Sequence, residues 1–374
     1  MIAKLIYIFV CISGLFLSTA TKAELVVRQS TALSGVLASS GVPMAKGAEV
    51  YFAELNAKGG VAGQKIKFIS TDDEYKVNKT VANAESACRD ENTVVMMGGS
   101  GTANNEALFT QKVLASCELA LVGPRTGALS LRDASNAYMF HVRPTYAEEV
   151  QKIIKHFETT GLKKIGIVYQ DDAFGQDGLV AAQNAIKDLR LSAVLTVAYP
   201  RNTADVKQAV DKALVLNPDA ILLLTTTAST AAFIQAYRSA AGAAYLAGLS
   251  INDVSSIVKK VGDGYARGVV IAMPFPDLYK ARTTIAKQYL AALQRYAPNE
   301  KPSYPGLEGY VVAKAIGYAL AKASKPNRQS VYKALQGMSD VNLGDFYLNY
   351  SSTTRSGSHY VDIGVINKDG ILYR

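Results

Sequence analysis

The stretch from Ala45 to Asp73, AKGAEVYFAELNAKGGVAGQKIKFISTDD, contains the three signals that decide the fold class. Residues 45–57 carry apolar side chains at helical spacing, and Lys58-Gly59-Gly60 then supplies the glycines that commonly end a helix. The short apolar run Ile66–Thr71 predicts a buried strand, which Asp72-Asp73 ends. A helix, a glycine stop and a buried strand in this order are typical of an α/β protein with a parallel sheet.

The same alternation continues along the rest of the chain. Further strands are predicted at 24–29, 93–97, 119–122, 164–169, 193–198, 220–224, 269–273 and 360–367. Further helices are predicted at 81–89, 105–115, 148–159, 178–189, 203–216, 229–240, 280–296 and 309–323, and a Ser/Gly loop at 31–41. This pattern indicates two doubly wound lobes, each a parallel sheet with helices on both faces.

The composition agrees with two such lobes. Of the 374 residues, 49% are hydrophobic and 19% are charged, which excludes a disordered chain and allows two domains of about 100–200 residues each. The formal net charge of +9 would suit an acidic partner, but the basic residues occur as scattered pairs such as Lys163-Lys164. We therefore expect a solvated surface and no nucleic-acid partner.

The first 23 residues have the pattern of a cleavable secretory signal peptide. Lys4 precedes the apolar run Leu5–Leu17, and small residues follow as far as Ala23. The run of 13 residues is shorter than the roughly 20 that span a bilayer, so we expect an exported chain without membrane insertion. Cleavage is predicted after Ala23, with Ala20 as the alternative. Cleavage after Ala23 also removes Lys4 and Lys22, which lowers the net charge from +9 to +7.

Export leaves two cysteines in the mature chain, Cys88 and Cys117. Thiols pair in oxidising compartments, so we expect a disulfide, with two buried thiols as the alternative. A catalytic cysteine is not expected, because none of the three histidines stands in a motif with a cysteine.

Small and polar residues follow most of the predicted strands. They form the loops Gly98–Thr102, Gly123–Gly127, Asp171–Gly175, Thr225–Thr227 and Gly248–Ser250. Ligands of doubly wound sheets lie at the carboxyl ends of the strands, where Gly, Ser and Thr donate hydrogen bonds to anions. Helix capping is the alternative role for any single hydroxyl, and the glycine motifs of nucleotide-binding proteins are not met.

Several motifs of the chain resemble the periplasmic leucine/isoleucine/valine-binding protein family. They are Leu33-Ser34-Gly35, Gly47-Ala48, the run Leu55–Gly63, Asp72-Asp73 and Glu308-Gly309-Tyr310, in order with the loops above. The resemblance covers residues 24–374 and is most specific in the Asn-Ala-x-Gly-Gly-x-x-Gly run. It implies the type I periplasmic binding fold and a role as the solute-binding subunit of an ABC importer.

In that family three crossing strands join two lobes that close on a ligand. After the signal peptide at 1–23, the resemblance implies lobe I at 24–143 plus 275–362 and lobe II at 144–274 plus 363–374. The crossings are expected near Arg143-Pro144, Ala272–Pro274 and Ile363-Gly364. It further implies a periplasmic monomer that hands its ligand to an inner-membrane permease, without a cofactor or metal.

The resemblance also assigns the ligand-binding residues. The carboxylate of the ligand is expected on lobe I, at Gly99, Ser100, Thr102, Arg125, Thr126 and Gly127. Phe174 is the expected aromatic residue of lobe II. Three positions depart from the family. It has aromatic residues at two of them, which are Ser40 and either Thr226 or Thr227 in this chain. At the third position, Ser250 replaces the acid that pairs with the ammonium of the ligand.

The missing acid leaves two kinds of ligand open. Asp253 and Glu308 are candidates to replace it, with a surface or helix-capping role as the alternative for each. Without a replacement, the ligand is expected to lack an ammonium: an amide, a urea-like compound, or an aliphatic or aromatic carboxylate. Arg125 is then a candidate anion partner, unless it faces solvent.

The main prediction is therefore a non-enzymatic transport receptor for a small amino-acid-like solute, such as a branched-chain amino acid or a related amide or carboxylate. A periplasmic sensory ligand-binding module is the first alternative. An exported α/β enzyme is the second, and it is disfavoured because the chain has no G-x-S-x-G elbow, metal-spaced histidines or redox cysteine pair.

Overall fold

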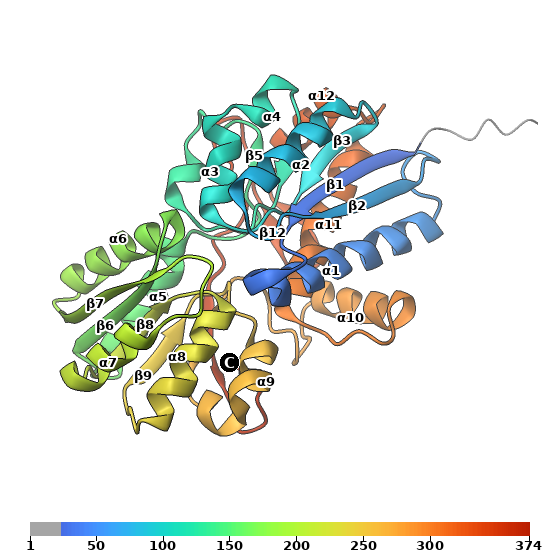
Figure 1. Ribbon diagram of the computed structural model, residues 1–374. Coiled ribbons are helices and arrows are strands. Elements are labelled where there is room, and N and C mark those ends of the chain that lie inside the picture. Colours follow the sequence, from blue (N-terminus) through green and yellow to red (C-terminus); the bar gives the residue numbers. More distant parts are fainter. Residues whose placement is uncertain (1–23) are drawn as a thin grey trace, which may run out of the picture.

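A computed structural model describes residues 24–374, which form two α/β lobes (Figure 1). The predicted signal peptide lies outside the described residues. Lobe I contains a five-stranded sheet in the order β2-β1-β3-β4-β5, in which every neighbouring pair is parallel. Its strands are β1 (Leu25–Thr31), β2 (Ile66–Asp72), β3 (Thr93–Met97), β4 (Leu121–Val122) and β5 (Met139–Phe140).

Lobe II contains a seven-stranded sheet in the order β14-β13-β10-β9-β8-β6-β7. Its strands are β6 (Lys164–Asp171), β7 (Ser192–Pro200), β8 (Ala220–Leu224), β9 (Tyr245–Gly248), β10 (Val270–Met273), β13 (Asp362–Ile366) and β14 (Leu372–Tyr373). The pairs β10–β13 and β13–β14 are antiparallel, and the others are parallel. A separate antiparallel pair joins β11 (Val341–Asn342) and β12 (Tyr347–Leu348).

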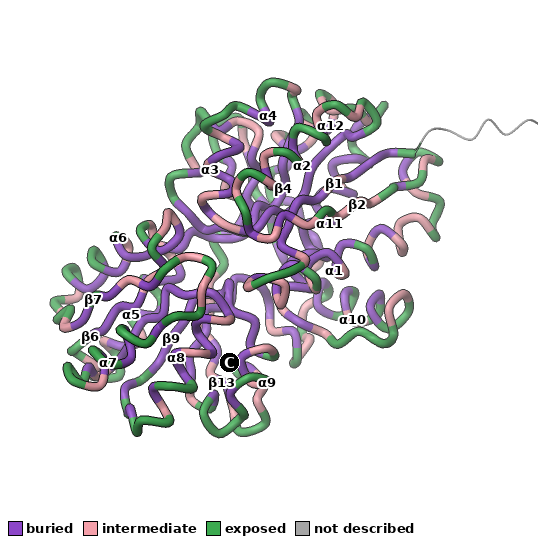
Figure 2. The backbone as a smooth tube through the Cα atoms, viewed as in Figure 1, coloured by how far each residue is buried: buried purple, intermediate pink, exposed green. Residues whose placement is uncertain are grey.

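Helices cover both faces of each sheet, so the strands are buried (Figure 2). In lobe I the helices are α1 (Ala38–Ala57), α2 (Val77–Arg89), α3 (Thr102–Thr110), α4 (Val113–Ser116), α10 (Thr284–Tyr296), α11 (Tyr304–Lys322) and α12 (Arg328–Gln336). In lobe II they are α5 (Tyr146–Thr159), α6 (Ala173–Asp188), α7 (Lys207–Leu216), α8 (Thr227–Ser239) and α9 (Val254–Ala266). Met96 and its two neighbours in β3 serve opposite faces, because Val95 and Met97 join the core of α1 and α11 while Met96 joins that of α2 to α4.

The chain passes between the two sheets three times, which gives the two-lobed α/β fold that the sequence predicted. The passages follow Phe140 and Met273 and precede Asp362. The third passage lies before the predicted Ile363-Gly364, because both residues pair with β10 inside the second sheet. The lobe boundaries themselves stay a prediction.

Most of the predicted elements are present, and one loop is wrong. Helix α1 ends at Ala57 as predicted, but it begins at Ala38, so Ser40 lies on a helix and not in a loop ending at residue 41. Gly41 suggested a break, yet it serves packing: a Cβ there would lie 1.9 Å from the carbonyl oxygen of Ala32. The helix predicted at 105–115 is divided by Lys112, whose φ is 55°.

Helices α1 and α11 cross at glycines, which explains two of the sequence motifs. A Cβ on Gly47 would lie 1.9 Å from the oxygen of Gly306, and one on Gly309 would lie 1.9 Å from the oxygen of Met44. Neither contact leaves room for a methyl group without backbone movement.

Gly309→Ala should therefore destabilise the protein by about 1–3 kcal/mol, the usual cost of overpacking a core. Gly337→Ala is the matched control, because a Cβ there would lie 3.5 Å from its nearest neighbour, the oxygen of Lys333. Urea unfolding of both variants measures the difference. Equal stability of the two variants would show that the crossing tolerates a side chain.

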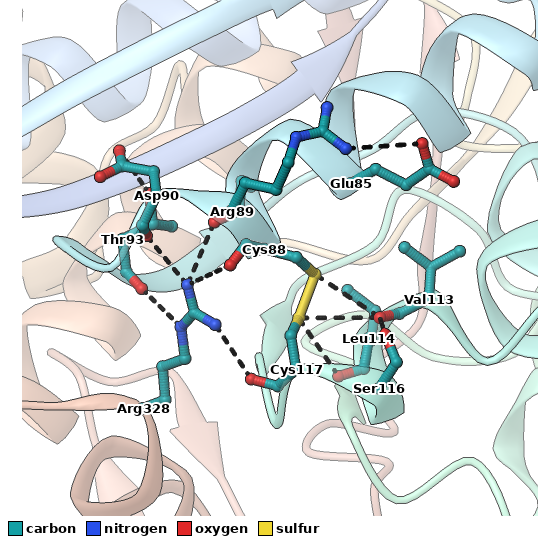
Figure 3. Close-up of a disulfide and its surroundings, with 11 residues drawn as sticks. Glu85, Cys88, Arg89, Asp90, Thr93, Val113, Leu114, Ser116, Cys117 and Arg328 are labelled. Atoms are coloured by element: carbon teal, nitrogen blue, oxygen red, sulfur yellow. Dashed lines mark hydrogen bonds and ion pairs between the residues drawn. A yellow bond between two sulfur atoms is a disulfide. The ribbon is translucent and has the colours of Figure 1, made fainter.

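A disulfide joins Cys88 and Cys117, and Arg328 lies beside it (Figure 3). The guanidinium of Arg328 donates to five backbone carbonyls, those of Ala87, Cys88, Asp90, Thr93 and Cys117, at 2.9–3.2 Å. One side chain thus ties α12 to the end of α2, to β3 and to the disulfide, although these segments are distant in sequence.

The purified mature protein should contain no free thiol under denaturing conditions. Replacing both Cys88 and Cys117 by serine should cost about 3–4 kcal/mol, the chain-entropy value for a loop of this length. Thiol titration and urea unfolding test the two statements. Two titratable thiols per chain would contradict them.

Candidate functional site

Four hydroxyl side chains gather at the carboxyl ends of β1, β3 and β4. The Oγ1 atoms of Thr102 and Thr126 are 2.8 Å apart, and Thr31 Oγ1 lies 3.0 Å from Ser100 Oγ. All four are at most 1% exposed. Strand order explains the meeting, since β1, β3 and β4 are neighbours and their parallel ends share one edge. We call Thr31, Ser100, Thr102 and Thr126 the hydroxyl cluster.

The backbone holds this cluster together. Arg125 N–H donates to the carbonyl of Gly99 at 2.8 Å, and Ser100 forms a parallel bridge with Arg125. Gly101 precedes α3 and offers no capping side chain, so the first N–H groups of that helix have no acceptor within it. Gly127 O accepts from Tyr146 N–H at 2.7 Å, which places the first turn of α5 against the same loop.

Lobe II has its own buried groups at the carboxyl ends of its strands. Phe174, at the start of α6, is buried and packs edge-to-face against Tyr146 with ring centroids 5.1 Å apart. Thr226 precedes α8, and its N–H donates to the hydroxyl of Tyr199 at 3.2 Å. Tyr199 in turn donates to Gln170 Oε1 at 3.0 Å.

A second set of contacts joins the lobes through Arg201. Its Nη2 donates to Tyr75 O at 3.0 Å and to Asn104 Oδ1 at 2.7 Å, both in lobe I. Its Nε lies 3.0 Å from Asp172 Oδ2 in lobe II, and its guanidinium lies 4.0 Å from the centroid of the Tyr75 ring. We call Arg201 and its partners Tyr75, Asn104 and Asp172 the Arg201 latch.

Tyr75 extends the latch into the lobe interface. Its hydroxyl accepts from Gln170 Nε2 at 3.1 Å and lies 3.4 Å from Asp172 Oδ2. Burial and the neighbouring Asp172 raise the pKa of Tyr75, although Arg201 acts in the opposite direction. The tyrosine therefore keeps its proton and its role as a neutral hydrogen-bonding group.

Two arginines and two glutamates form a buried ionic chain at the other end of the interface. Arg125 Nε lies 3.0 Å from Glu308 Oε2, and Arg143 Nε lies 3.5 Å from Glu308 Oε1. Arg143 Nη2 lies 4.0 Å from Glu149 Oε1. All four side chains are at most 4% exposed. We call Arg125, Arg143, Glu149 and Glu308 the charge chain.

Ser250 lies at the centre of the charge chain. Its N–H and its hydroxyl donate to the two carboxylate oxygens of Glu149 at 2.9 and 2.7 Å, and its hydroxyl accepts from Arg143 Nη2 at 2.5 Å. Burial raises the pKa of Glu149, although Arg143 and Ser250 favour its charged form. Burial opposes the charge of Arg143, but Glu308 and Glu149 outweigh it and raise the pKa of Arg143.

The comparisons with known proteins agree with this architecture. The family model described as "Periplasmic binding protein" matches residues 29–370. The chain belongs to the periplasmic binding protein family. Its type is that of the Leu/Ile/Val-binding proteins: "Leu/Ile/Val-binding protein homolog 7" of Brucella abortus (strain 2308) is 24% identical over 337 residues, which cover 85% of this chain and 82% of the relative.

Two solved structures are similar over almost the whole chain. A substrate-binding periplasmic protein from Ralstonia solanacearum is 35% identical, with a TM-score of 0.90 and coverage of 94% of this chain and 99% of that chain. An extracellular ligand-binding receptor from Verminephrobacter eiseniae is 27% identical, with a TM-score of 0.87 and coverage of 94% and 100%. As a periplasmic binding protein, the chain belongs to a class of solute-binding receptors. In residues 24–374, no helix combines the length and hydrophobicity that crossing a membrane requires.

Several of the predicted site residues of this binding protein contact one another or a residue of the other lobe. Gly99, Ser100, Thr102, Arg125, Thr126 and Gly127 form one backbone-linked group. Ser40, on α1, donates to Ile251 O at 3.3 Å. Asp253 accepts from Ser256 N–H at 2.9 Å as the cap of α9, so its carboxylate has the capping role.

Sequence reasoning missed Tyr75, Glu149, Tyr199 and Arg201. Tyr199 is notable, because its hydroxyl reaches Thr226, where the sequence lacks the expected tyrosine. The predicted strand at 193–198 ended one residue before Tyr199, and its apolar-polar alternation was the only signal available. Glu149 was placed on a helix without a role, and no local motif marks a helical glutamate as buried.

Arg201→Met should loosen the contact between the lobes, because it removes charge-assisted hydrogen bonds of about 1.5–3 kcal/mol from the lobe interface. We expect a larger radius of gyration in small-angle X-ray scattering than for the unchanged protein. Arg238→Met is the matched control, since Arg238 donates only to Gly242 O and Ala244 O within lobe II. Identical scattering of the two variants would contradict a role of the latch in closure.

Proposed function

We propose that this protein is the solute-binding receptor of an ABC importer for a small amino-acid-like solute that carries a carboxylate. The hydroxyl cluster is the observation that carries this proposal. It is buried, and Thr102 of the cluster begins the uncapped first turn of α3. The Leu/Ile/Val-binding name of the Brucella relative agrees with a ligand of this size and chemistry.

The hydroxyl cluster is suited to a carboxylate for a simple reason. In each hydroxyl pair, Thr102 with Thr126 and Thr31 with Ser100, one O–H group donates to the other oxygen. The Thr126 hydroxyl also hydrogen-bonds to the side chain of Tyr146. When Tyr146 donates to Thr126 and Thr126 donates to Thr102, the Thr102 hydroxyl can donate outward, as can one hydroxyl of the Thr31–Ser100 pair. Two hydroxyl donors and the N–H groups at the start of α3 match the two oxygens of a carboxylate, whose burial requires several such bonds.

Delivery to a membrane partner completes the proposal. Residues 1–23 direct the chain to the periplasm and are removed, and the mature monomer presents its closed form to an inner-membrane permease. The contacts between the lobes support a closed form that a partner can distinguish, because the Arg201 latch and the charge chain both join residues of the two lobes.

Thr102→Val and Thr126→Val should each weaken ligand binding about tenfold to hundredfold, the effect of losing a hydrogen bond to a charged group. The experiment is a thermal-shift screen of amino acids, their amides and aliphatic and aromatic carboxylates, followed by calorimetric titration of whichever compound raises the melting temperature. Thr159→Val is the control, because Thr159 is exposed on α5 and its hydroxyl donates to His156 O.

Two results would count against the proposal. Unchanged affinity in both cluster variants would show that the hydroxyl cluster does not bind the carboxylate of the ligand. A screen in which no amino acid, amide or carboxylate stabilises the protein would remove the proposed ligand class.

A further inference from the structure

The buried acids at the lobe interface all have partners within the protein. Glu308 lies against Arg125 and Arg143, and both oxygens of Glu149 accept from Ser250. Asp172 caps α6 through Phe174 N–H and Gly175 N–H and pairs with Arg201. Asp253 caps α9. Among these four acids, therefore, none is left to pair with a ligand cation.

Arg125 occupies a set of acceptors that would suit an ammonium group. Its Nε donates to Glu308 Oε2 at 3.0 Å, and its Nη2 donates to Ile251 O at 3.2 Å and to Ser250 O at 3.4 Å. One carboxylate and two carbonyl oxygens are what a buried ammonium requires, because it has three N–H donors and one positive charge. In this protein a guanidinium of the chain itself uses them.

The position of Arg125 links this cation to the ligand-binding edge. Its backbone adjoins Thr126 and bridges Ser100, both of the hydroxyl cluster, while its side chain reaches lobe II. Thr126 of the hydroxyl cluster and the filled cation position thus belong to one loop, and Ser100 lies on the neighbouring loop that bridges to it.

We propose that Arg125 takes the place of the ligand ammonium, so that this receptor selects carboxylates without an α-ammonium group, such as plain or 2-oxo carboxylates. The inference rests on the proposed function, since it refines the ligand of the same site. An α-amino acid would have to displace Arg125 from Glu308, which would leave a buried charge unpaired.

The test compares matched pairs of compounds that differ in the ammonium. The pairs are leucine against 4-methylpentanoate and 4-methyl-2-oxopentanoate, valine against 3-methylbutanoate, and phenylalanine against 3-phenylpropanoate. Calorimetric titration of the full mature protein should show the compound without an ammonium binding at least tenfold more tightly in whichever series binds.

The outcomes separate the two proposals. If an amino acid binds as tightly as its partner or more tightly, the inference about Arg125 is overturned and the receptor function stands. If no compound of any pair binds, the proposed function itself is overturned.

Variants of Arg125 test the cause of the preference. Arg125→Met frees Glu308, so the ratio of the two affinities should shift at least tenfold toward the amino acid. Arg125→Lys keeps a cation at the position and should retain the original preference, and Arg238→Met should leave the ratio unchanged. If folded Arg125→Met has the same ratio of affinities as the unchanged protein, the inference is overturned. If that variant does not fold, the comparison of compound pairs on the unchanged protein decides the inference.

Discussion

The buried guanidinium of Arg143 is the constraint on which the arrangement of the lobes depends. It lies at the first passage between the sheets, is 1% exposed, and has Glu308 of lobe I on one side and Glu149 and Ser250 of lobe II on the other. A buried charge without a partner costs several kcal/mol, so each lobe supplies part of what Arg143 needs. Separating the lobes at this point would break the contacts of Arg143 with Glu308, Glu149 or Ser250. Water would then have to enter the interface to solvate the separated charges.

The interface has three parts in a fixed order. The charge chain includes Arg125, which precedes Thr126 of the hydroxyl cluster, and Thr102 of that cluster begins the helix that carries Asn104 of the Arg201 latch. The uncharged donors thus lie between two ionic contacts that join the lobes. Closure on both sides excludes water from the cluster, and hydrogen bonds to a ligand anion are stronger in such surroundings.

Much of the fold could be predicted from the sequence, and so could part of the candidate site. The alternating segments, the end of α1 at Ala57 and the strand β3 at Thr93–Met97 are decided by local pattern. The loops after β3 and β4 were predicted to bind the ligand, because parallel strands bring their carboxyl ends together. The strands β5 and β9, of two and four residues, were missed. The helix α9 was missed because Gly262 and Gly264 interrupt its pattern.

The sequence by itself determined the α/β class, the two-lobed organisation and the small residues at the strand ends. These depend on side-chain periodicity and glycine placement, which act over a few residues. Only the tertiary structure decided that Arg125 pairs with Glu308, that Glu149 supports Ser250 and that Tyr199 reaches Thr226. Arg125 and Glu308 are 183 positions apart in the sequence, and Glu149 and Ser250 are 101 positions apart. Such pairings follow from the need of buried charges and polar groups for partners, a need that the packing of the whole chain satisfies and no local pattern records.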